Sequence, residues 1–132
     1  MIENKAIILV PSSFIPGNIC KQNAVKFIHE AEYKVVEKDA KTDIKTTFVK
    51  SINGKDINFE VHDSVRGLSK DDWKRVVAVF VNGSEWEFRD WPKGENTLSI
   101  FLKIKGFYMK YSDLPTPPNV LKWNVKILNC FF

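Results

Sequence analysis

The loop PSSFIPG stands between the apolar run IILV and a segment with helical periodicity, which is the setting of a phosphate-binding loop. Phosphate loops of the form G-x-x-x-x-G-K-[ST] need glycines that let backbone N–H groups approach the phosphates, a Lys for charge, and a Ser or Thr for Mg²⁺. Here Gly17 is the only glycine, and Asn18 and Ile19 occupy the places of the Lys and the Ser or Thr. Pro11 and Pro16 each lack a backbone N–H. We therefore interpret this loop as a structural turn.

Two adjacent acids, Asp71 and Asp72, could take part in general acid/base chemistry. They also stand in the stretch LSKDDW, where Ser69 is a candidate helix N-cap and Asp72 occupies the capping-box position. The first turn of a helix favours carboxylates. We therefore predict a structural role for both acids.

Metal and nucleophile chemistry have little support in the sequence. The chain contains two histidines and two cysteines, namely His29, His62, Cys20 and Cys130. Their separations match no zinc-ligand spacing, and no Ser/His/Asp set can be assembled from sequence alone. We expect the cysteines, one in a helix and one in an apolar strand, to be reduced and buried. The sequence predicts no metal, no cofactor and no enzyme activity.

The elements that must position these residues follow from periodicity and turn signals. A first helix, capped at Asn18, is expected to place residues 20, 24, 27, 28 and 31 on one apolar face. Asn53-Gly54 joins two alternating segments and is a strong hairpin signal. Gly106 is expected to end a later helix. Strands are predicted at 5–10, 44–52, 55–62, 75–81, 107–111 and 123–130. Helices are predicted at 18–31, as one short turn within 68–73, and from a cap at Asn96 or Thr97 to about 104, with one further helical turn within 114–122.

This alternation predicts an α/β fold with a mixed sheet of about six strands, helices on both faces and the first strand central. The order is that of the Ras-like GTPase fold, with a single antiparallel strand from the hairpin. The nucleotide motifs of that fold are absent, because HDSVRG lacks the D-x-x-G spacing and KYSD is not N-K-x-D. The sequence therefore predicts a Ras-like fold without its nucleotide site.

Length and composition agree with one domain spanning residues 1–132. The chain is 44% hydrophobic, which suffices for a core without disulfides. Its net charge of +4 allows an anionic partner without requiring one. Neither a signal peptide nor an apolar run long enough to cross a bilayer is visible, so we expect a soluble intracellular protein that does not contact membranes.

The second half of the chain carries a family resemblance. The stretches DWKRVVAVFVNGSEWEFRDWP and KGFYMKY…VLKWNVKIL resemble the C-terminal domain of the parafibromin family. Members of this family are subunits of the RNA polymerase II-associated factor (Paf) complex. Further matching positions are IILVPSS, Asn18, Phe27, Trp73, Arg75, Gly83, Trp86, Phe88, Trp91, Phe101, Gly106 and Trp123-Asn124-Val125.

The chain also departs from the family pattern. Glu87 replaces a usual Gln and adds negative charge. The sequence stops at Phe132, where the family continues into a final helix, so we expect that helix to be absent and one sheet face to be under-covered. A truncated chain and a divergent protein both fit this expectation.

The resemblance implies a Ras-like domain that does not hydrolyse GTP. It implies a nuclear, non-catalytic role in transcription elongation, in which the domain helps tether the Paf complex to transcribing RNA polymerase II and chromatin. The implied partners are other Paf-complex subunits and the phosphorylated repeats of the polymerase or of an elongation factor. The resemblance implies no small-molecule substrate.

A phosphopeptide reader needs fixed cationic donors and exposed aromatic surface. The residues that fit this role are Arg75, Trp86, Arg89 and Lys93. Arg75 could equally form an ion pair with Asp71 or Asp72. Trp91, which precedes a proline, is expected to belong to the core, as are Phe101 and Trp123.

Two other functions remain open. One is a degenerate GTPase that still binds nucleotide, and the missing motifs argue against it. The other is direct binding of nucleic acid through the mixture of lysines and aromatic residues. A net charge of only +4 and the lack of a basic stripe make direct nucleic-acid binding the weaker binding hypothesis.

Overall fold

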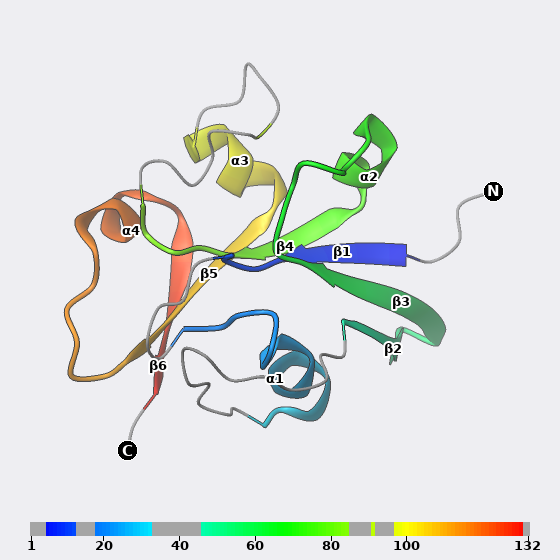
Figure 1. Cartoon of the computed structure of the whole chain (residues 1–132), viewed down its shortest axis with the longest axis horizontal. Coiled ribbons are helices and arrows are strands. Elements are labelled where there is room, and N and C mark those ends of the chain that lie inside the picture. The colour runs from blue at the N-terminus through cyan, green and yellow to red at the C-terminus, as the bar shows by residue number, and fades with distance from the viewer. Residues whose placement is uncertain (1–4, 13–17, 33–45, 85–90, 92–96, 131–132) are drawn as a thin grey trace.

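A computed structural model describes residues 5–12, 18–32, 46–84, 91 and 97–130 of the chain, and its elements alternate between strands and helices (Figure 1). In chain order they are β1 (Lys5–Leu9), α1 (Ala24–Glu30), β2 (Thr47–Ile52), β3 (Lys55–His62), α2 (Lys70–Lys74), β4 (Val76–Phe80), α3 (Thr97–Lys103), β5 (Lys105–Tyr111), α4 (Pro118–Lys122) and β6 (Val125–Cys130). This order matches the one predicted from the sequence.

The six strands form one mixed sheet in the order β2-β3-β1-β4-β5-β6. Every neighbouring pair is parallel except β2 with β3, which is antiparallel. The strand order and the single antiparallel strand confirm the predicted Ras-like topology. They also place β1 in the interior of the sheet, as expected.

Strand β1 is apolar and buried from Ala6 to Leu9, and only Lys5 at its start is exposed. The strand pairs with β3 on one edge and with β4 on the other. Ile7 is only 1% exposed, and Ile8 and Leu9 are each 3% exposed. Side chains that alternate along a strand enter opposite faces, so both faces of β1 are covered.

The β2–β3 hairpin forms at the turn predicted from sequence. Asn53 and Gly54 have φ angles of 52° and 80°, both in the left-handed region. A two-residue turn with two positive φ values matches the right-handed twist of the strands, and Asn-Gly tolerates it at low cost. The hairpin places β2 at one edge of the sheet.

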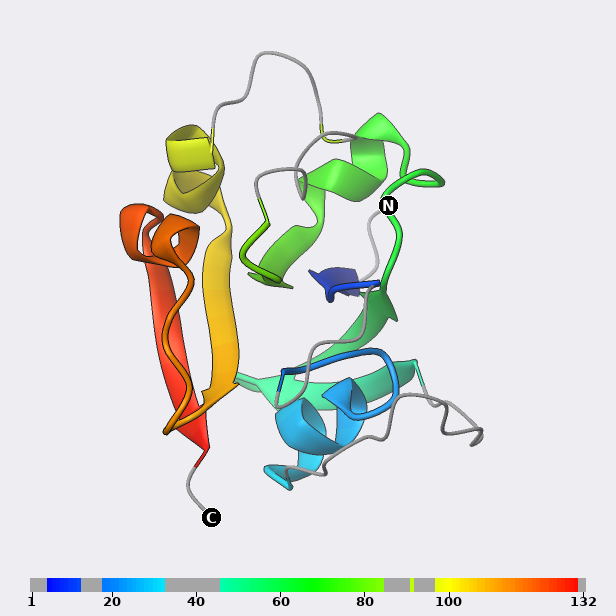
Figure 2. The same cartoon turned by 60° about the vertical axis from the view of Figure 1, so that its left-hand side comes forward.

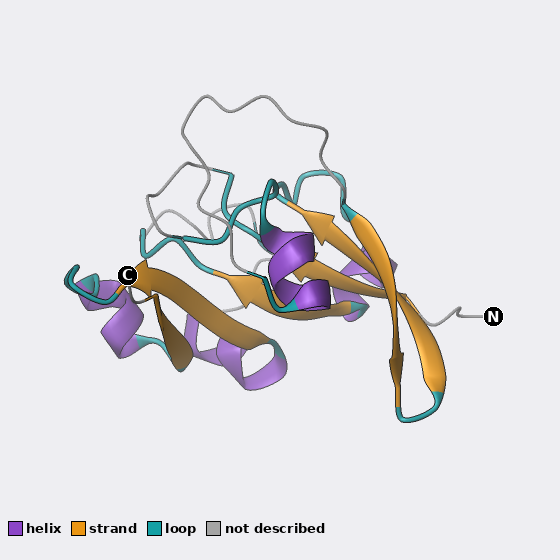
Figure 3. Ribbon diagram, turned by 90° about the horizontal axis from the view of Figure 1, so that it is seen from below, coloured by secondary structure: helices purple, strands orange, loops and turns teal. Residues whose placement is uncertain are grey.

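Helices cover both faces of the sheet, as Figures 1 and 2 show. Helix α1 lies on one face of the sheet, and Figure 3 is viewed from that side. Helices α2, α3 and α4 lie on the other face. Two hydrophobic cores result. The α1 core contains Ala6, Ile8, Val10, Ile19, Ala24, Val25, Phe48, Phe59, Val61, Phe80 and Met109. The opposite core contains Ile7, Leu9, Val76, Val79, Val81, Trp91, Ile100, Phe101, Tyr108 and Val120.

Helix α1 begins later than predicted. Its first residue is Ala24, and Asn23 rather than Asn18 stands at the N-cap position. Asn18 is instead buried, with 5% exposure, and its side chain bonds to distant strands. Cys20 therefore precedes the helix, and it is half-buried and free rather than fully buried. Residues 18–23 form a turn because their polar groups bond to side-chain amides before the helix starts.

Gly106 does not end a helix, which corrects a second expectation. Helix α3 ends at Lys103, and Gly106 is a buried residue of β5. A Cβ atom at Gly106 would lie 2.5 Å from the Phe101 ring and 3.1 Å from Val125. Glycine is thus required by close packing between α3 and β5.

On the α1 side of the sheet, coverage decreases toward β6. Phe107 of β5 and Leu128 of β6 are half-buried at the margin of the α1 core, whereas Met109 is only 3% exposed. Residues 131–132 lie outside the described part of the chain. The absence of a final helix therefore stays a prediction.

Candidate functional site

Side-chain amides occupy the turn between β1 and α1, where a phosphate loop would present its N–H groups. Asn18 Oδ1 accepts the backbone N–H of Ile19 at 2.8 Å, and Asn23 Oδ1 accepts that of Cys20 at 2.8 Å. Asn18 Nδ2 donates to the Val81 carbonyl at 3.1 Å. Asn18 and Asn23 are both buried. These contacts support the interpretation of the loop as a structural turn, because two donors that could bind phosphate are already bonded.

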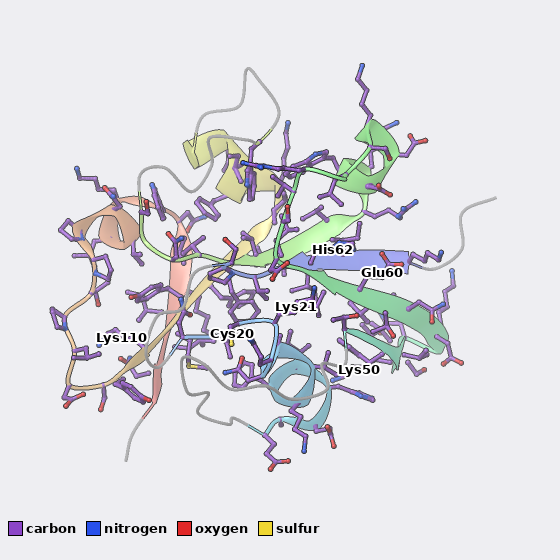
Figure 4. All side chains as sticks on the ribbon, in the orientation of Figure 1. Cys20, Lys21, Lys50, Glu60, His62 and Lys110 are labelled. Atoms are coloured by element: carbon purple, nitrogen blue, oxygen red, sulfur yellow. The ribbon has the colours of Figure 1, made fainter. Side chains whose placement is uncertain are left out.

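The carboxyl ends of β1 and β3 lie at the same end of the sheet, and this is the end at which open α/β sheets bind ligands. Lys21 lies in the turn between β1 and α1 (Figure 4). Asp63 follows β3, and the side chains of Lys21 and Asp63 pair at 3.7 Å. Both side chains are about one-third exposed. The one lysine of this turn is thus partly neutralised by a carboxylate, which leaves little positive charge for a nucleotide phosphate.

Arg75 is held by both its backbone and its side chain. It is the C-cap residue of α2, and its carbonyl accepts the backbone N–H of Ile7 at 2.9 Å. Its guanidinium Nη2 donates to Asp72 Oδ1, so the ion pair considered from sequence is present. The Arg75 side chain is 24% exposed. Within the described residues, the buried Nε has no acceptor.

Asp72 joins this arginine to the start of α2. Its Oδ2 accepts the backbone N–H of Ser69 at 2.9 Å, and the Ser69 hydroxyl accepts the backbone N–H of Asp72 at 3.1 Å. This is the capping box predicted from sequence. The bond from the Ser69 backbone is the main cause that lowers the pKa of Asp72, and Arg75 acts in the same direction. Asp72 therefore remains ionised beside Arg75 at neutral pH.

A hollow of about 360 Å³ lies beside α2 and α3, which we call the tryptophan hollow. Trp73 and Trp91 contact each other in it, with ring centroids 5.0 Å apart. Trp91 is only 9% exposed, which confirms its predicted place in the core. The full lining is Trp73, Lys74, Val76, Trp91, Ile100, Lys103 and Ile104.

The predicted site residues divide into one that the structure describes and three that it does not. Arg75 lies between Lys74 and Val76, which both line the tryptophan hollow. Trp86, Arg89 and Lys93 lie outside the described residues. Trp91, from the same sequence segment, packs against Trp73 of α2.

Three residues of this surface were missed by the sequence interpretation, namely Trp73, Lys74 and Lys103. Nothing in their local pattern distinguishes them, because each also fits the amphipathic face of a short helix. Trp73 is recognised as part of this surface because it contacts Trp91, which comes from a different segment of the chain.

The described residues contain no group of three His, Cys, Asp or Glu side chains that could hold a metal ion. The sole ion pair that involves a histidine among these residues joins His62 to Glu60 at 3.1 Å (Figure 4). Over the same ranges, no helix has the length and apolar character needed to cross a membrane.

The family model described as "RNA pol II accessory factor, Cdc73 family, C-terminal" matches residues 3–130, nearly the whole sequence. The chain belongs to the Cdc73 family. This confirms the resemblance to parafibromin drawn from the motifs between Trp73 and Trp123. The Cdc73 family is a family of RNA polymerase II accessory factors.

Curated relatives and a solved structure agree with this membership. The Protein CDC73 homolog of Arabidopsis thaliana is 38% identical over 138 aligned residues, which cover 96% of this chain and 33% of the relative. Cell division control protein 73 of Saccharomyces cerevisiae is 32% identical over 71 residues, covering 53% of this chain and 18% of the relative. This chain thus spans a third or less of these Cdc73 proteins. The conserved domain of yeast Cdc73 superposes with a TM-score of 0.76 at 25% identity, covering 96% of this chain and 82% of that one.

Proposed function

We propose that this Cdc73-family domain is a non-catalytic, nuclear phosphopeptide-binding module of the Paf complex. In this role it helps tether the complex, together with its other subunits, to transcribing RNA polymerase II and chromatin. The ligands would be phosphorylated C-terminal repeats of the polymerase or of an elongation factor. The observation that supports the proposal is that Arg75 lies in the chain between Lys74 and Val76, which line the tryptophan hollow, in a family of polymerase accessory factors.

Arg75 has the properties of a phosphate-binding arginine. Its backbone is fixed by the end of α2 and by β1, so the guanidinium starts from a defined place. An arginine carries five N–H donors, and Asp72 is the acceptor that the described residues provide. A phosphate can accept from guanidinium N–H groups that Asp72 leaves unbonded, because the Arg75 side chain is 24% exposed.

The tryptophan hollow offers apolar surface for a side chain next to the phosphate. Repeats that carry Tyr or Pro beside a phosphoserine present flat apolar groups, which pack well against indole rings. Lys74 and Lys103 line the same hollow and add positive charge near a dianionic ligand. We expect Trp86, Arg89 and Lys93 to complete this site, and their contribution is part of the proposal.

The test is a calorimetric titration of the domain with phosphorylated and unphosphorylated heptad-repeat peptides. A hydrogen bond to a charged group contributes about 1.5–3 kcal/mol, so Arg75→Ala should weaken phosphopeptide binding about tenfold or more. Arg75→Lys, which keeps the charge and loses the planar fork, should also weaken it. The matched control is Lys55→Ala, which removes one positive charge from the exposed tip of the β2–β3 hairpin.

Equal affinity for the two peptide forms would overturn the proposal, because no phosphate would then need Arg75. A second contradicting result would be an equal loss of affinity in Arg75→Ala and Lys55→Ala, which would show a dependence on net charge alone. Circular dichroism of each variant verifies that the fold is retained.

A further inference from the structure

A second hollow, of about 640 Å³, lies beside the end of α3 and the first residues of β5 and β6. We call it the β5–β6 hollow. Phe107 of β5 and Lys126 of β6 are register partners within it, so their side chains lie on the same face of the sheet. The full lining is Phe101, Leu102, Lys103, Ile104, Lys105, Gly106, Phe107, Asn124, Val125 and Lys126.

The charged residues that line the β5–β6 hollow are all of one sign. Three of its lining residues are lysines, and none is acidic. Residues 96–130 contain five lysines and a single acid, Asp113. Asp113 follows the carboxyl end of β5, a strand of seven residues, and so lies about 20 Å from the hollow. Within the described part of the chain, Lys105 and Lys126 make no ion pair.

The hollow also carries apolar surface that is open to a partner. Leu102 is 82% exposed, the most exposed of the large hydrophobic residues that the structure describes. Phe107 and Val125 are half-buried. A leucine at this exposure gains about 25 cal/mol for each Å² of apolar surface that a partner covers, so its burial favours association.

We propose that the β5–β6 hollow binds an acidic segment of a protein partner. Aspartate or glutamate side chains of that segment pair with Lys105 and Lys126, and one of its apolar side chains packs against Leu102. The complementary charge identifies the occupant, since a lining that holds Lys105 and Lys126 and no acidic residue attracts carboxylates and repels basic segments. This site lies apart from Arg75 and goes beyond the proposed phosphopeptide function.

A nucleic acid fits this hollow less well than an acidic protein segment does. Single-stranded nucleic acids bind by stacking bases on exposed aromatic faces. Phe101 is only 5% exposed, and Phe107 stacks on Phe80 with ring centroids 5.3 Å apart. The lining of the hollow contains no arginine, which is the residue that binds phosphate through bidentate hydrogen bonds.

The test uses a short fluorescent peptide of glutamate and aspartate around one leucine, with a control peptide in which Gln and Asn replace the acids. The acidic peptide should bind in fluorescence anisotropy, and added salt should weaken it. The double variant Lys105→Glu/Lys126→Glu should lose about tenfold or more in affinity. Leu102→Ser should lose about threefold.

The matched control is Lys50→Glu/Lys55→Glu, which makes the same charge change on exposed residues of the β2–β3 hairpin at the opposite edge of the sheet. It should retain most of the binding, and Arg75→Ala should bind the acidic peptide normally even if it loses the phosphopeptide. Chemical-shift mapping on the unmodified protein should show the largest changes at residues 102–107 and 124–126.

Three results would overturn the inference. Equal losses in the two double variants would show attraction by net charge alone. Tighter binding of an oligouridine than of the acidic peptide, lost in Lys105→Glu/Lys126→Glu, would assign the hollow to nucleic acid. Shift changes confined to residues away from the hollow would place the peptide elsewhere, whatever the variants do.

Discussion

At the scale of single residues, Asp72 links the start of a helix to the arginine at its end. One carboxylate oxygen accepts the Ser69 backbone N–H, and the other accepts from Arg75. Because its folded-state pKa is lowered from 3.8, the carboxylate contributes stability that is present above the unfolded-state pKa. That stability is lost as the pH falls through the lower folded-state value. Asp72 also places a negative charge where a phosphate would approach Arg75.

The variant Asp72→Asn separates these two effects. An asparagine Oδ1 can still accept the Ser69 N–H, so the capping box should be largely kept. Removing the negative charge should strengthen phosphopeptide binding about two- to fivefold, because like charges no longer compete for the guanidinium. The measurement is the same calorimetric titration with phosphorylated repeat peptide.

Asp71→Asn is the matched control for this prediction. Asp71 pairs with Lys74 at 3.7 Å in a largely exposed ion pair, so its loss should alter affinity little. If Asp72→Asn instead weakened binding as much as Arg75→Ala, the carboxylate would be needed to hold the arginine and the prediction would fail.

At the scale of elements, Asn18 ties the turn before α1 to two strands. It donates to Val81 at the end of β4, and its Oδ1 lies 3.4 Å from the backbone N–H of Met109 in β5. Because the residue is only 5% exposed, the backbone groups that it contacts lie away from bulk water. The turn is thereby fixed against the sheet by polar contacts as well as by the apolar side chain of Ile19, which is 1% exposed.

Asn18→Ala should lower the free energy of unfolding by about 2–4 kcal/mol, because it removes side-chain hydrogen bonds from buried backbone groups. Urea unfolding followed by circular dichroism measures the change. Asn58→Ala is the control, since Asn58 is an exposed residue of β3 and should cost well under 1 kcal/mol. Similar losses for the two variants would show that the amide contacts of Asn18 carry little stability.

At the scale of the whole molecule, the protein has the Ras-like topology. The carboxyl ends of its strands, where a nucleotide would bind in that fold, hold contacts within the chain. The amides of Asn18 and Asn23 and the pair of Lys21 with Asp63 occupy the places where a nucleotide would need free donors. Both proposed binding surfaces instead flank α3, away from these strand ends. Under these two proposals, the binding sites lie apart from the nucleotide site of the fold.

Titration with GTP and Mg²⁺ should give no binding at micromolar concentrations. The reason is that the turn lacks the glycines and the lysine of a phosphate loop, and its described donors are bonded within the chain. A saturable heat signal in this range would contradict the interpretation of the loop as a structural turn. The phosphopeptide titration on the same preparation serves as the check that the protein is active in binding.

The sequence alone determined the features that depend on neighbours in the chain. Asn53-Gly54 predicted the hairpin because the φ angles of two residues set the turn. Ser69 and Asp72 predicted the capping box because its partners are three residues apart. The apolar run in β1 predicted a strand covered on both faces, and the order of the elements predicted the sheet. The motifs from Trp73 onward also sufficed to identify the Cdc73 family.

Only the tertiary structure decided the roles that depend on distant residues. Asn18 resembles a helix cap in sequence, but its side chain bonds to a carbonyl 63 positions away. Gly106 resembles a helix end, but its small size is required by the ring of Phe101 and by Val125. Trp73 and Trp91 meet across two elements, and Phe107 meets Lys126 through the register of β5 with β6. Local propensity contains no information on such contacts, because they form only when the whole chain packs into one sheet and two cores.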